Sequence, residues 1–495
     1  MKVSFIVPCS NLTNYGVRTI SSCLKLKGHQ VRLVFVLVER NNFRGVLSQG
    51  ILNELYELVS ASGLIGISVM TNFLGYAEQI TKAINSKNKS IPIVWGGAHP
   101  TVDPERCMQN VRIVCRGEGE RSILELVDCL EESRPIEEIK NLWVYEGEKI
   151  HRNGVRGLIE NLDVLPDPDY DLSSQFILKG QKFVPLDKNT LKDNMIKMGN
   201  KSRYSVFSSR GCPGKCHFCI NDSLKDLYQK KGLFVRKRSV KRVIQELKNN
   251  IKTLGFESVC IQDEDFMVRT FEEIKEFCEE YKKEINLPFQ CEFSPRTFDV
   301  NKVKQLIEVG LSRVQVGIQS VNEGTNYLLY NRKYSMEEID RVVGFFSRYP
   351  EIICNLHFLV HNPWESEASL ISSIRFVSKL SEVFNIKLYP LVFYPGTRLY
   401  DRAFSQGLIK DFFEDVVYKD WSQNRVKDSD YLTLIFYLLV FIRGRKVLYK
   451  KVVSFLFYIL TSSFVRTVFK FPFILGFFRT LFSIIYLSKS ENRPR

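Results

Sequence analysis

The sequence predicts an α/β protein in which an open parallel sheet is followed by a partial barrel of parallel strands and then by an apolar, basic helical region. Two series of apolar runs alternate with helical segments, which is typical of parallel sheets. A loop with three cysteines, GCPGKCHFC at residues 211–219, lies near the start of the second series. The chain has 495 residues, which is too long for one ordinary domain, so we expect two or three.

The first series predicts an open α/β sheet. Because helical or loop segments separate its strands, the sheet should be parallel and covered on both faces. Ligands of such sheets lie beyond the carboxyl ends of the strands. The loops PCSNLTNYG, SVMTNFLGY, GGAHPT and RGEGE are therefore the candidates for ligand binding. The strands are expected at residues 3–8, 31–38, 64–70, 91–97 and 111–117.

The order of these loops is more specific than any one of them. A strand, then GGAHPT, then a strand ending in GEGE and a helix resembles the Rossmann-like cobalamin-binding domain of many radical S-adenosylmethionine (SAM) enzymes, here over residues 1–140. The resemblance implies contacts to the corrin and its nucleotide tail from residues 68–71, 96–100 and 117–120. The alternative is that the glycines are ordinary turn residues. The candidate cobalamin-binding residues are Ser68, Thr71, Gly96, Gly97, His99, Gly117, Glu118 and Gly119.

One motif of many cobalamin proteins is missing from the sequence. The Asp-x-His-x-x-Gly motif, whose histidine ligates cobalt, does not occur in this chain. By resemblance, the cofactor would be held without a protein histidine on its lower face. His99 is then expected to be a hydrogen-bonding loop residue and not a cobalt ligand.

Residues 160–172, ENLDVLPDPDYDL, carry two prolines and five acidic residues. The residue before a proline favours an extended backbone, so this stretch is interpreted as an interdomain connection. We assign residues 141–198 to a linker region between the first domain and a second domain at residues 199–410.

The three cysteines of the loop, Cys212, Cys216 and Cys219, indicate a metal centre. The twelve cysteines are scattered and the start of the chain does not resemble a secretory signal, which favours a reducing cytoplasm and metal binding over disulfides. Thiolates are suited to iron–sulfur clusters. With three thiolates, one iron of a 4Fe–4S cluster stays free of protein and can chelate SAM.

The Cys-x3-Cys-x2-Cys spacing, with Phe218 before the last cysteine, is the radical SAM signature. Two other interpretations of the three cysteines exist. His217 could complete a zinc site, but it lies between two ligands of one short loop and would be badly aimed. The three cysteines could also simply be buried.

Six strands are expected in the second domain, each followed by a helical segment or loop. They are YSVFSS, SVCIQDEDF, FQCEFSPRT, RVQVGIQS, IICNLHFLVHN and IKLYPLVFYPGT, and they predict a partial (β/α)6 barrel. A helix between the first two should bury Val240, Val243, Ile244, Leu247, Ile251 and Leu254. Ligands of such barrels lie at the carboxyl ends of the strands.

The family resemblance implies roles for polar residues at these strand ends. Asp263, Glu264 and Asp265 would contact the SAM amino group or ribose, although a solvated helix-capping run is the alternative. Gln319 and Ser320 match the fourth-strand motif, and Pro395 and Gly396 match the sixth-strand end near the adenosine. The fifth strand departs from the pattern, because VHNPWES stands where relatives have Gly-Leu-Pro-Gly-Glu.

The C-terminal region, residues 411–495, is apolar and basic. From residue 431 onward it contains eleven Lys or Arg and one acid, Glu491, which accounts for +10 of the net charge of +15, so nucleic-acid binding is not indicated. Its apolar runs are shorter than the roughly 20 residues of a membrane span. Basic residues between Phe- and Leu-rich segments favour an interfacial position on anionic lipid. The alternative is a helical domain packed on the barrel.

The resemblance implies a cobalamin-dependent radical SAM enzyme in the cytoplasm, with the membrane surface as an expected partner. A reductant such as flavodoxin or ferredoxin would supply an electron, SAM would yield a 5′-deoxyadenosyl radical, and a methyl group would reach an unactivated carbon of a small-molecule or lipid-like substrate. Relatives also cyclise or rearrange substrates. The alternatives are a cobalamin- and cluster-containing redox sensor, and a radical SAM enzyme whose first domain is empty.

Overall fold

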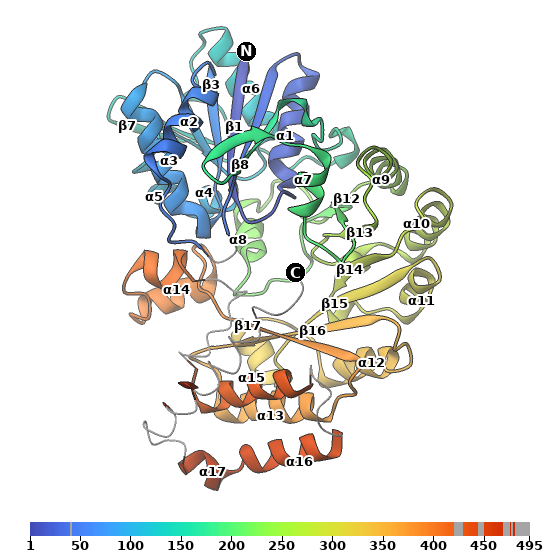
Figure 1. The fold of residues 1–495 in the computed structure, drawn as a ribbon. Coiled ribbons are helices and arrows are strands. Elements are labelled where there is room, and N and C mark those ends of the chain that lie inside the picture. Colours follow the sequence, from blue (N-terminus) through green and yellow to red (C-terminus); the bar gives the residue numbers. More distant parts are fainter. Residues whose placement is uncertain (40–41, 420–428, 444–449, 469–475, 477–478, 481–495) are drawn as a thin grey trace. The chain divides into compact units, whose positions relative to one another are not determined.

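A computed structural model describes the chain except for residues 40–41, 420–428, 444–449, 469–475, 477–478 and 481–495 (Figure 1). Two compact units can be distinguished. The first comprises Met1–Cys212, Phe218–Val259 and the described part of 393–420, and the second comprises Pro213–His217, Cys260–Val392 and the described part of 421–495.

The five strands predicted for the first domain are confirmed and lie in one sheet. They are β1 (Lys2–Cys9), β2 (Gln30–Leu37), β3 (Leu64–Ser68), β4 (Ile93–Gly96) and β5 (Ile113–Cys115), and all their pairings are parallel. Most of their residues are buried, which explains apolar runs without alternation.

Helices connect these strands and supply the other half of the core. The helix α1 (Tyr15–Leu26) contacts α6 (Glu120–Glu131), whereas α2 (Gln49–Val59) contacts α3 (Leu74–Lys87). The side chains of α2 and α3 pack with Ile6, Val34 and Trp95 of the sheet. Two short helices, α4 (Ala98–Val102) and α5 (Pro104–Met108), lead from β4 to β5.

The assignment of residues 141–198 to a linker is wrong over much of its length. These residues form β6 (Leu142–Glu146), β7 (Lys149–Arg152), β8 (Gln175–Lys179), β9 (Lys182–Pro185) and the short helix α7 (Lys188–Asp193). The four strands extend the sheet at both edges to nine strands in the order β7-β6-β5-β4-β3-β1-β2-β8-β9. Because β6, β7 and β9 pair antiparallel to their neighbours, the sheet is mixed.

The physical reason for the error lies in two tight hairpins. Glu146 pairs with Lys149 and Lys179 pairs with Lys182, so each turn has two residues, and each begins with a glycine at positive φ, Gly147 or Gly180. The acidic, proline-containing stretch between them holds only the short 3₁₀ turns η2 (Leu162–Val164) and η3 (Leu172–Ser174).

The six strands predicted for the second domain are also confirmed. They are β10 (Arg203–Val206), β13 (Ser258–Ile261), β14 (Phe289–Phe293), β15 (Leu311–Gln319), β16 (Ile353–Val360) and β17 (Phe384–Pro390), and they follow one another in the sheet in chain order. The pairs β14–β15, β15–β16 and β16–β17 are parallel.

Helices lie between the strands of this sheet. They are α9 (Val240–Leu254), α10 (Phe271–Glu284), α11 (Val300–Glu308), α12 (Met336–Phe346) and α13 (Glu367–Lys379). The apolar face predicted for α9 is buried except at Ile251, which is half-buried. A left-handed Gly255 ends this helix.

Part of the C-terminal region is a helical layer on the second sheet's helices. Its helices are α15 (Tyr431–Arg443), α16 (Lys450–Leu460) and α17 (Ser463–Val468), and both α15 and α16 contact α13. The Phe436 ring packs 5.6 Å from that of Phe358, and Arg443 donates to the carbonyl oxygens of Leu380 and Ser381. Among the described residues, no helix is long and apolar enough to cross a membrane. Most of the tail beyond α17 lies outside the described residues.

Candidate active site

The cysteine loop runs from β11 (Ser209–Arg210) to α8 (Ile220–Leu227), and β11 pairs antiparallel with β12 (Arg236–Lys237). Gly211, directly before the loop, has φ +87°, and a β-carbon there would collide with the carbonyl oxygen of Phe234. Only glycine therefore fits at the entrance of the loop. Cys212, Cys216, Cys219 and Phe218 are half-buried, and none of the three cysteines takes part in a disulfide.

Arg332 is a charged neighbour of the loop that the sequence did not indicate. Its Nη1 donates to the sulfur of Cys216 at 3.4 Å, and its Nη2 donates to the carbonyl oxygen of Gly317 at 2.9 Å. Its Nε donates to the Tyr334 hydroxyl at 3.3 Å. A guanidinium with donors fixed on three sides is thus placed against one thiol of the loop.

Backbone carbonyl groups of Leu329 and Tyr330 hold His217 in place. Its ring Nδ1 lies 3.1 Å from the carbonyl oxygen of Leu329, and its backbone N–H donates to the carbonyl oxygen of Tyr330. Because a carbonyl oxygen only accepts, Nδ1 carries the proton.

The donor set of the loop fits an iron–sulfur cluster. Three soft thiols stand on one short loop, partly accessible, with a cation beside one of them. Over the described part of the chain, no three His, Cys, Asp or Glu side chains are arranged so that they could hold a metal ion. The three cysteines of the loop are included in this finding, although they are close in sequence.

The loops after β3 and β4 are tied together by predicted site residues. His99 is fully buried, and its Nδ1 lies 3.3 Å from the Thr71 hydroxyl. Its Nε2 is buried without a hydrogen-bond partner. Burial lowers the pKa of His99 to about 4, so the imidazole is neutral. A buried, unsatisfied polar atom among these loops fits a site that receives a polar ligand.

Gly96 and Gly97 differ in what a side chain would meet. Gly97 has φ +107°, and a β-carbon on it would lie 2.9 Å from the carbonyl oxygen of Val69, so the fold itself requires glycine. At Gly96 the nearest atom would be the β-carbon of Cys115 at 3.8 Å, which is ordinary contact. The room at Gly96 fits the close approach of a large ligand such as cobalamin. Ser68, at the end of β3, is half-buried.

The loop of Gly117, Glu118 and Gly119 leads from β5 into α6 and is held by protein groups. The Glu118 N–H donates to the Tyr228 hydroxyl at 2.7 Å, and a β-carbon at Gly117 would collide with that hydroxyl. The Glu118 carboxylate pairs with Arg210 and Arg236. This side chain, predicted to touch cobalamin, is thus engaged by the segment that flanks the cysteine loop. Two features of the sequence are consistent with this pairing: the acidic GEGE loop and the arginine directly before GCPGKC.

The acidic segment after β13 has three different environments. Asp263 is buried and Glu264 is exposed. Asp265 begins the 3₁₀ turn η4 (Phe266–Val268) and accepts from the Met267 N–H at 3.1 Å and the Thr297 hydroxyl at 2.6 Å. Burial raises the pKa of Asp265 to about 6. Asp265 has the capping role that was the alternative for this run.

Ser320 belongs to a buried network after β15. Its hydroxyl donates to the carboxylate of Glu365 at 3.0 Å, and the Ser369 hydroxyl donates to the same carboxylate at 2.5 Å. Burial raises the pKa of Glu365. Glu365 comes from the divergent VHNPWES stretch, where the sequence reasoning assigned no residue. Gln319, half-buried beside a register shift, has φ +62°.

The YPGT segment packs against elements of the first unit. Pro395 is buried, and the carbonyl oxygen of Gly396 accepts from the hydroxyl of Ser223 in α8. Gly396 has φ +78°, and a β-carbon there would lie 2.8 Å from that of Val102 in α4. Close packing accounts for this glycine.

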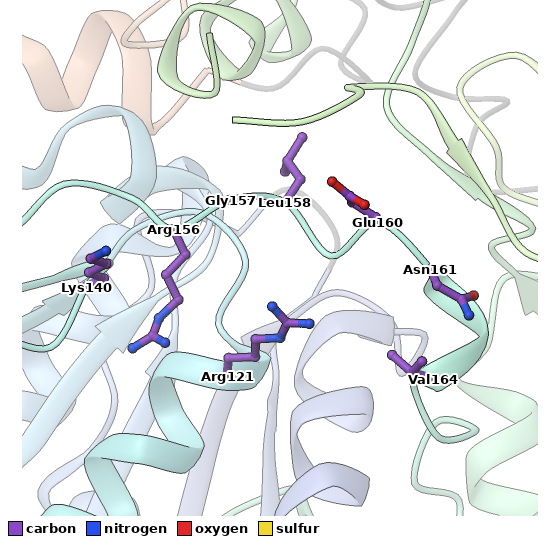
Figure 2. Close-up of a pocket in the computed structure, with 8 residues that line it drawn as sticks. All are labelled: Arg121, Lys140, Arg156, Gly157, Leu158, Glu160, Asn161 and Val164. Atoms are coloured by element: carbon purple, nitrogen blue, oxygen red, sulfur yellow. The ribbon is translucent and has the colours of Figure 1, made fainter. Parts of the chain in front are cut away.

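A cavity of about 450 Å³ is lined by residues that the sequence did not predict for any site (Figure 2). The basic side chains Arg121, Lys140 and Arg156 line it, and Arg156 is already paired with Glu125. No sequence pattern indicates this cavity, because its lining comes from three separate segments: Arg121 at the start of α6, Lys140 before β6, and residues 156–164.

Two family descriptions match the chain. Residues 1–127 match the B12 binding domain, and residues 206–371 match the radical SAM superfamily. A curated relative, the uncharacterized methyltransferase PH0819 of Pyrococcus horikoshii, is 28% identical over 70% of this chain and 70% of its own length. The anaerobic magnesium-protoporphyrin IX monomethyl ester cyclase of Synechocystis is 24% identical over 68% of this chain and 62% of its own length.

Solved structures with both domains share the fold. The radical SAM methyltransferase TsrM of Kitasatospora setae, with tryptophan and a SAM analogue bound, has a TM-score of 0.65 at 16% identity and covers 82% of this chain and 76% of its own. The cobalamin-dependent radical enzyme OxsB, with aqua-cobalamin and SAM bound, has a TM-score of 0.61 at 16% identity and covers 90% of this chain and 61% of its own.

The fold and both matches define an enzyme class that combines a B12-binding domain with a radical SAM domain. This chain carries a segment that matches each of the two domains, and its cysteine loop lies within the radical SAM match. The two family matches imply a 4Fe–4S cluster, SAM and cobalamin as its cofactors.

Proposed function

We propose that the protein is a methyltransferase that acts on an unactivated carbon of a small molecule. The observation that carries this proposal is the presence of both domains on one chain that shares the TsrM fold over 82% of its length. The naming of the Pyrococcus relative as a methyltransferase supports the same reaction.

In this proposal the second domain, residues 199–410, initiates the reaction. Cys212, Cys216 and Cys219 hold the cluster, which supplies the electron for reductive cleavage of SAM. The segments at residues 263–265 and 319–320 border SAM, with Asp265 and Ser320 acting by fixing their loops. Arg332 orients the loop through Cys216.

The first domain, residues 1–140, borders the second cofactor. Cobalamin supplies methyl-transfer chemistry, and the loops at residues 68–71 and 96–100 are its nearest protein groups in this proposal. His99 acts there as a neutral hydrogen-bonding residue, because its Nδ1 is engaged by Thr71 and its pKa is lowered by burial.

The test is anaerobic turnover of full-length protein with dithionite, SAM and hydroxocobalamin. Formation of both 5′-deoxyadenosine and S-adenosylhomocysteine supports methylation. A redox sensor would cleave no SAM, and an enzyme with an empty first domain would form 5′-deoxyadenosine while holding no cobalt. Either outcome would overturn the proposal.

Cyclisation is the second candidate reaction, and the named cyclase of Synechocystis favours it. A cyclase would form 5′-deoxyadenosine without transferring a methyl group to the product. Mass analysis of the product therefore separates the two reactions, since methylation adds one carbon and cyclisation adds none.

We also propose a peripheral position on the inner face of the membrane, with a lipid-like molecule as one candidate substrate. The helices α16 and α17 expose Phe455, Tyr458 and Phe464 at 67%, 59% and 79%. Exposed aromatic side chains within a strongly basic region suit an anionic lipid surface.

A further inference from the structure

Four charged side chains join the β5–α6 loop to the strands that flank the cysteine loop. The Glu118 carboxylate lies 3.0 Å from Nη1 of Arg210 and 2.9 Å from Nη1 of Arg236. The Glu120 carboxylate lies 2.5 Å from Nη2 of Arg210. Arg210 and Arg236 face each other in the β11–β12 pair. We call these four side chains the clamp.

The clamp is largely withdrawn from water. The exposed fractions of the Glu120 and Arg236 side chains are both 6%, and those of Glu118 and Arg210 are 16% and 23%. Burial opposes ionisation of Glu118, but Arg210 and Arg236 outweigh it and lower the pKa of this carboxyl. Removing one partner of a buried pair leaves an uncompensated charge, so the four groups hold one another in place.

Hydrogen bonds with the main chain fix the acidic end of the clamp from other sides. The Ile159 N–H donates to the second oxygen of Glu118 at 3.0 Å, and Arg236 donates to the Ile159 carbonyl oxygen at 2.8 Å. Together with the bond to the Tyr228 hydroxyl, these contacts leave the β5–α6 loop little freedom to move without Arg210. Arg210 in turn directly precedes Gly211 and Cys212.

We propose that Arg210 is a positioning residue that couples cobalamin binding to the placement of Cys212. The proposal rests on the proposed function, in which Cys212 holds the cluster, and on the family resemblance, which implies that residues 117–120 contact cobalamin. A displacement of Glu118 and Glu120 on cobalamin binding moves Arg210, which lies two residues before Cys212. By linkage, the cluster must then change cobalamin affinity by the factor by which cobalamin changes cluster binding.

The test compares cobalamin affinity of the full-length protein with the cluster present and after its removal by a chelator. Equilibrium dialysis against hydroxocobalamin, followed by cobalt analysis, gives both dissociation constants. We expect affinities that differ by about fivefold or more. In Arg210→Gln the two affinities should become nearly equal. Glu120→Gln keeps the side-chain shape. It should reduce the ratio of the two dissociation constants less than Arg210→Gln does, because Glu118 still pairs with Arg210.

Arg242→Gln is the matched control. Arg242 pairs with Asp167 at 2.5 Å, and its exposed fraction of 23% equals that of Arg210. It lies in α9, outside the clamp, so this variant should keep the ratio of the unaltered protein. A general effect of losing an ion pair would lower the ratio in both arginine variants and would overturn the proposal.

The unaltered protein alone also decides the matter, without any variant having to fold. Equal cobalamin affinities with and without the cluster would overturn the coupling and leave the proposed function standing. Failure to bind cobalamin in either form would overturn both. The Mössbauer spectrum of the cluster, which reports iron alone, should change on cobalamin addition in the unaltered protein and in Arg242→Gln but not in Arg210→Gln.

Discussion

The loops that follow the first sheet differ from those that follow the second in what they place at the strand ends. At the end of β4, Gly96 and Gly97 bring bare backbone to the sheet edge, and His99 keeps one nitrogen without a partner. After β13 and β15, Asp265 and Ser320 bond to their own loops. The loops of the first sheet therefore keep groups that can still bind a ligand, whereas Asp265 and Ser320 of the second sheet stabilise their own loops. An acidic or hydroxyl residue at a strand end is therefore weaker evidence of contact with a ligand than open glycine backbone.

The largest expected effect is loss of the cluster. Replacing Cys212, Cys216 and Cys219 by Ala together should abolish iron binding and SAM cleavage, because the loop then has no thiolate ligands. Cobalamin should still bind to the first sheet, though more weakly if the clamp couples the two. Iron and cobalt analysis after anaerobic reconstitution measures both. Retention of about four irons per chain would sink the assignment and point to Cys260, Cys278 or Cys291 as ligands.

A pH-dependent effect should distinguish Asp265 from its neighbours. Its folded pKa of about 6 lies above the ordinary value of 3.8, so its contribution to stability is fully present below pH 3.8 and is lost as the pH rises through 6. The total change is up to about 3 kcal/mol. Asp265→Asn removes the titration, so the stability of the unaltered protein relative to this variant should fall between pH 4 and 7 in urea unfolding. A constant difference over that range would contradict the buried environment of Asp265.

Gly96 and Gly97 should separate cofactor binding from folding. The β-carbon of Gly96→Val would make only ordinary contacts within the protein, but the side chain occupies the proposed cobalamin surface, so cobalamin affinity should fall about 10-fold to 100-fold at unchanged iron content. Gly97→Ala should instead lower the free energy of unfolding by about 1–3 kcal/mol, because of its φ and the Val69 carbonyl oxygen. Normal cobalamin binding by a folded Gly96→Val would show that this edge does not face the cofactor.

Replacing Arg332 tests the electrostatic influence of this side chain on the cluster, and the expected effect is smaller. A cation donating to Cys216 favours the more negative, reduced cluster, so Arg332→Gln should lower the midpoint potential measured without SAM. Arg332→Lys keeps the charge but loses the planar fork, and should lie between the two. An unchanged potential in Arg332→Gln would mean that the contact with the sulfur has no influence on the cluster.

The smallest expected effect concerns the membrane surface. Replacing Phe455, Tyr458 and Phe464 by Ser should weaken binding to anionic vesicles a few-fold, and added salt should weaken binding of the unaltered protein. Phe404→Ser, at a site with 63% exposure in α14 (Arg398–Ser405), is the control. Equal vesicle binding by all three proteins would remove the membrane proposal and leave the tail as a packed helical layer.

The sequence was sufficient for most strands of both sheets. Buried parallel strands such as β1 and β2 read as unbroken apolar runs, and the cysteine spacing is a local signal. The hairpins β6–β7 and β8–β9 were missed because their strands have only four or five residues and the outer strands, β7 (KIHR) and β9 (KFVP), carry polar residues, so the turn glycines Gly147 and Gly180 were the clearest signals.

The partners of individual side chains were beyond the sequence for a different reason. Arg332 reaches Cys216 from 116 residues away, and Glu118 reaches Arg210 from 92 residues away. No local pattern encodes such pairs, since they depend on how strands register in three dimensions. Asp265 shows the same limit, because its partner Thr297 follows the next strand.

The two hairpins that widen the first sheet also determine how it ends. The outermost strands are β7, with Lys149 and Arg152, and β9, with Lys182 and Pro185. Lysine and proline on an edge strand discourage another chain from pairing with its free backbone N–H and C=O groups. Lysine does so because its charged side chain resists desolvation, and proline does so because it has no N–H to donate. A largely parallel sheet assembles slowly and is vulnerable to aggregation while it does so. These short strands thus protect the newly made chain from self-association through its sheet edges.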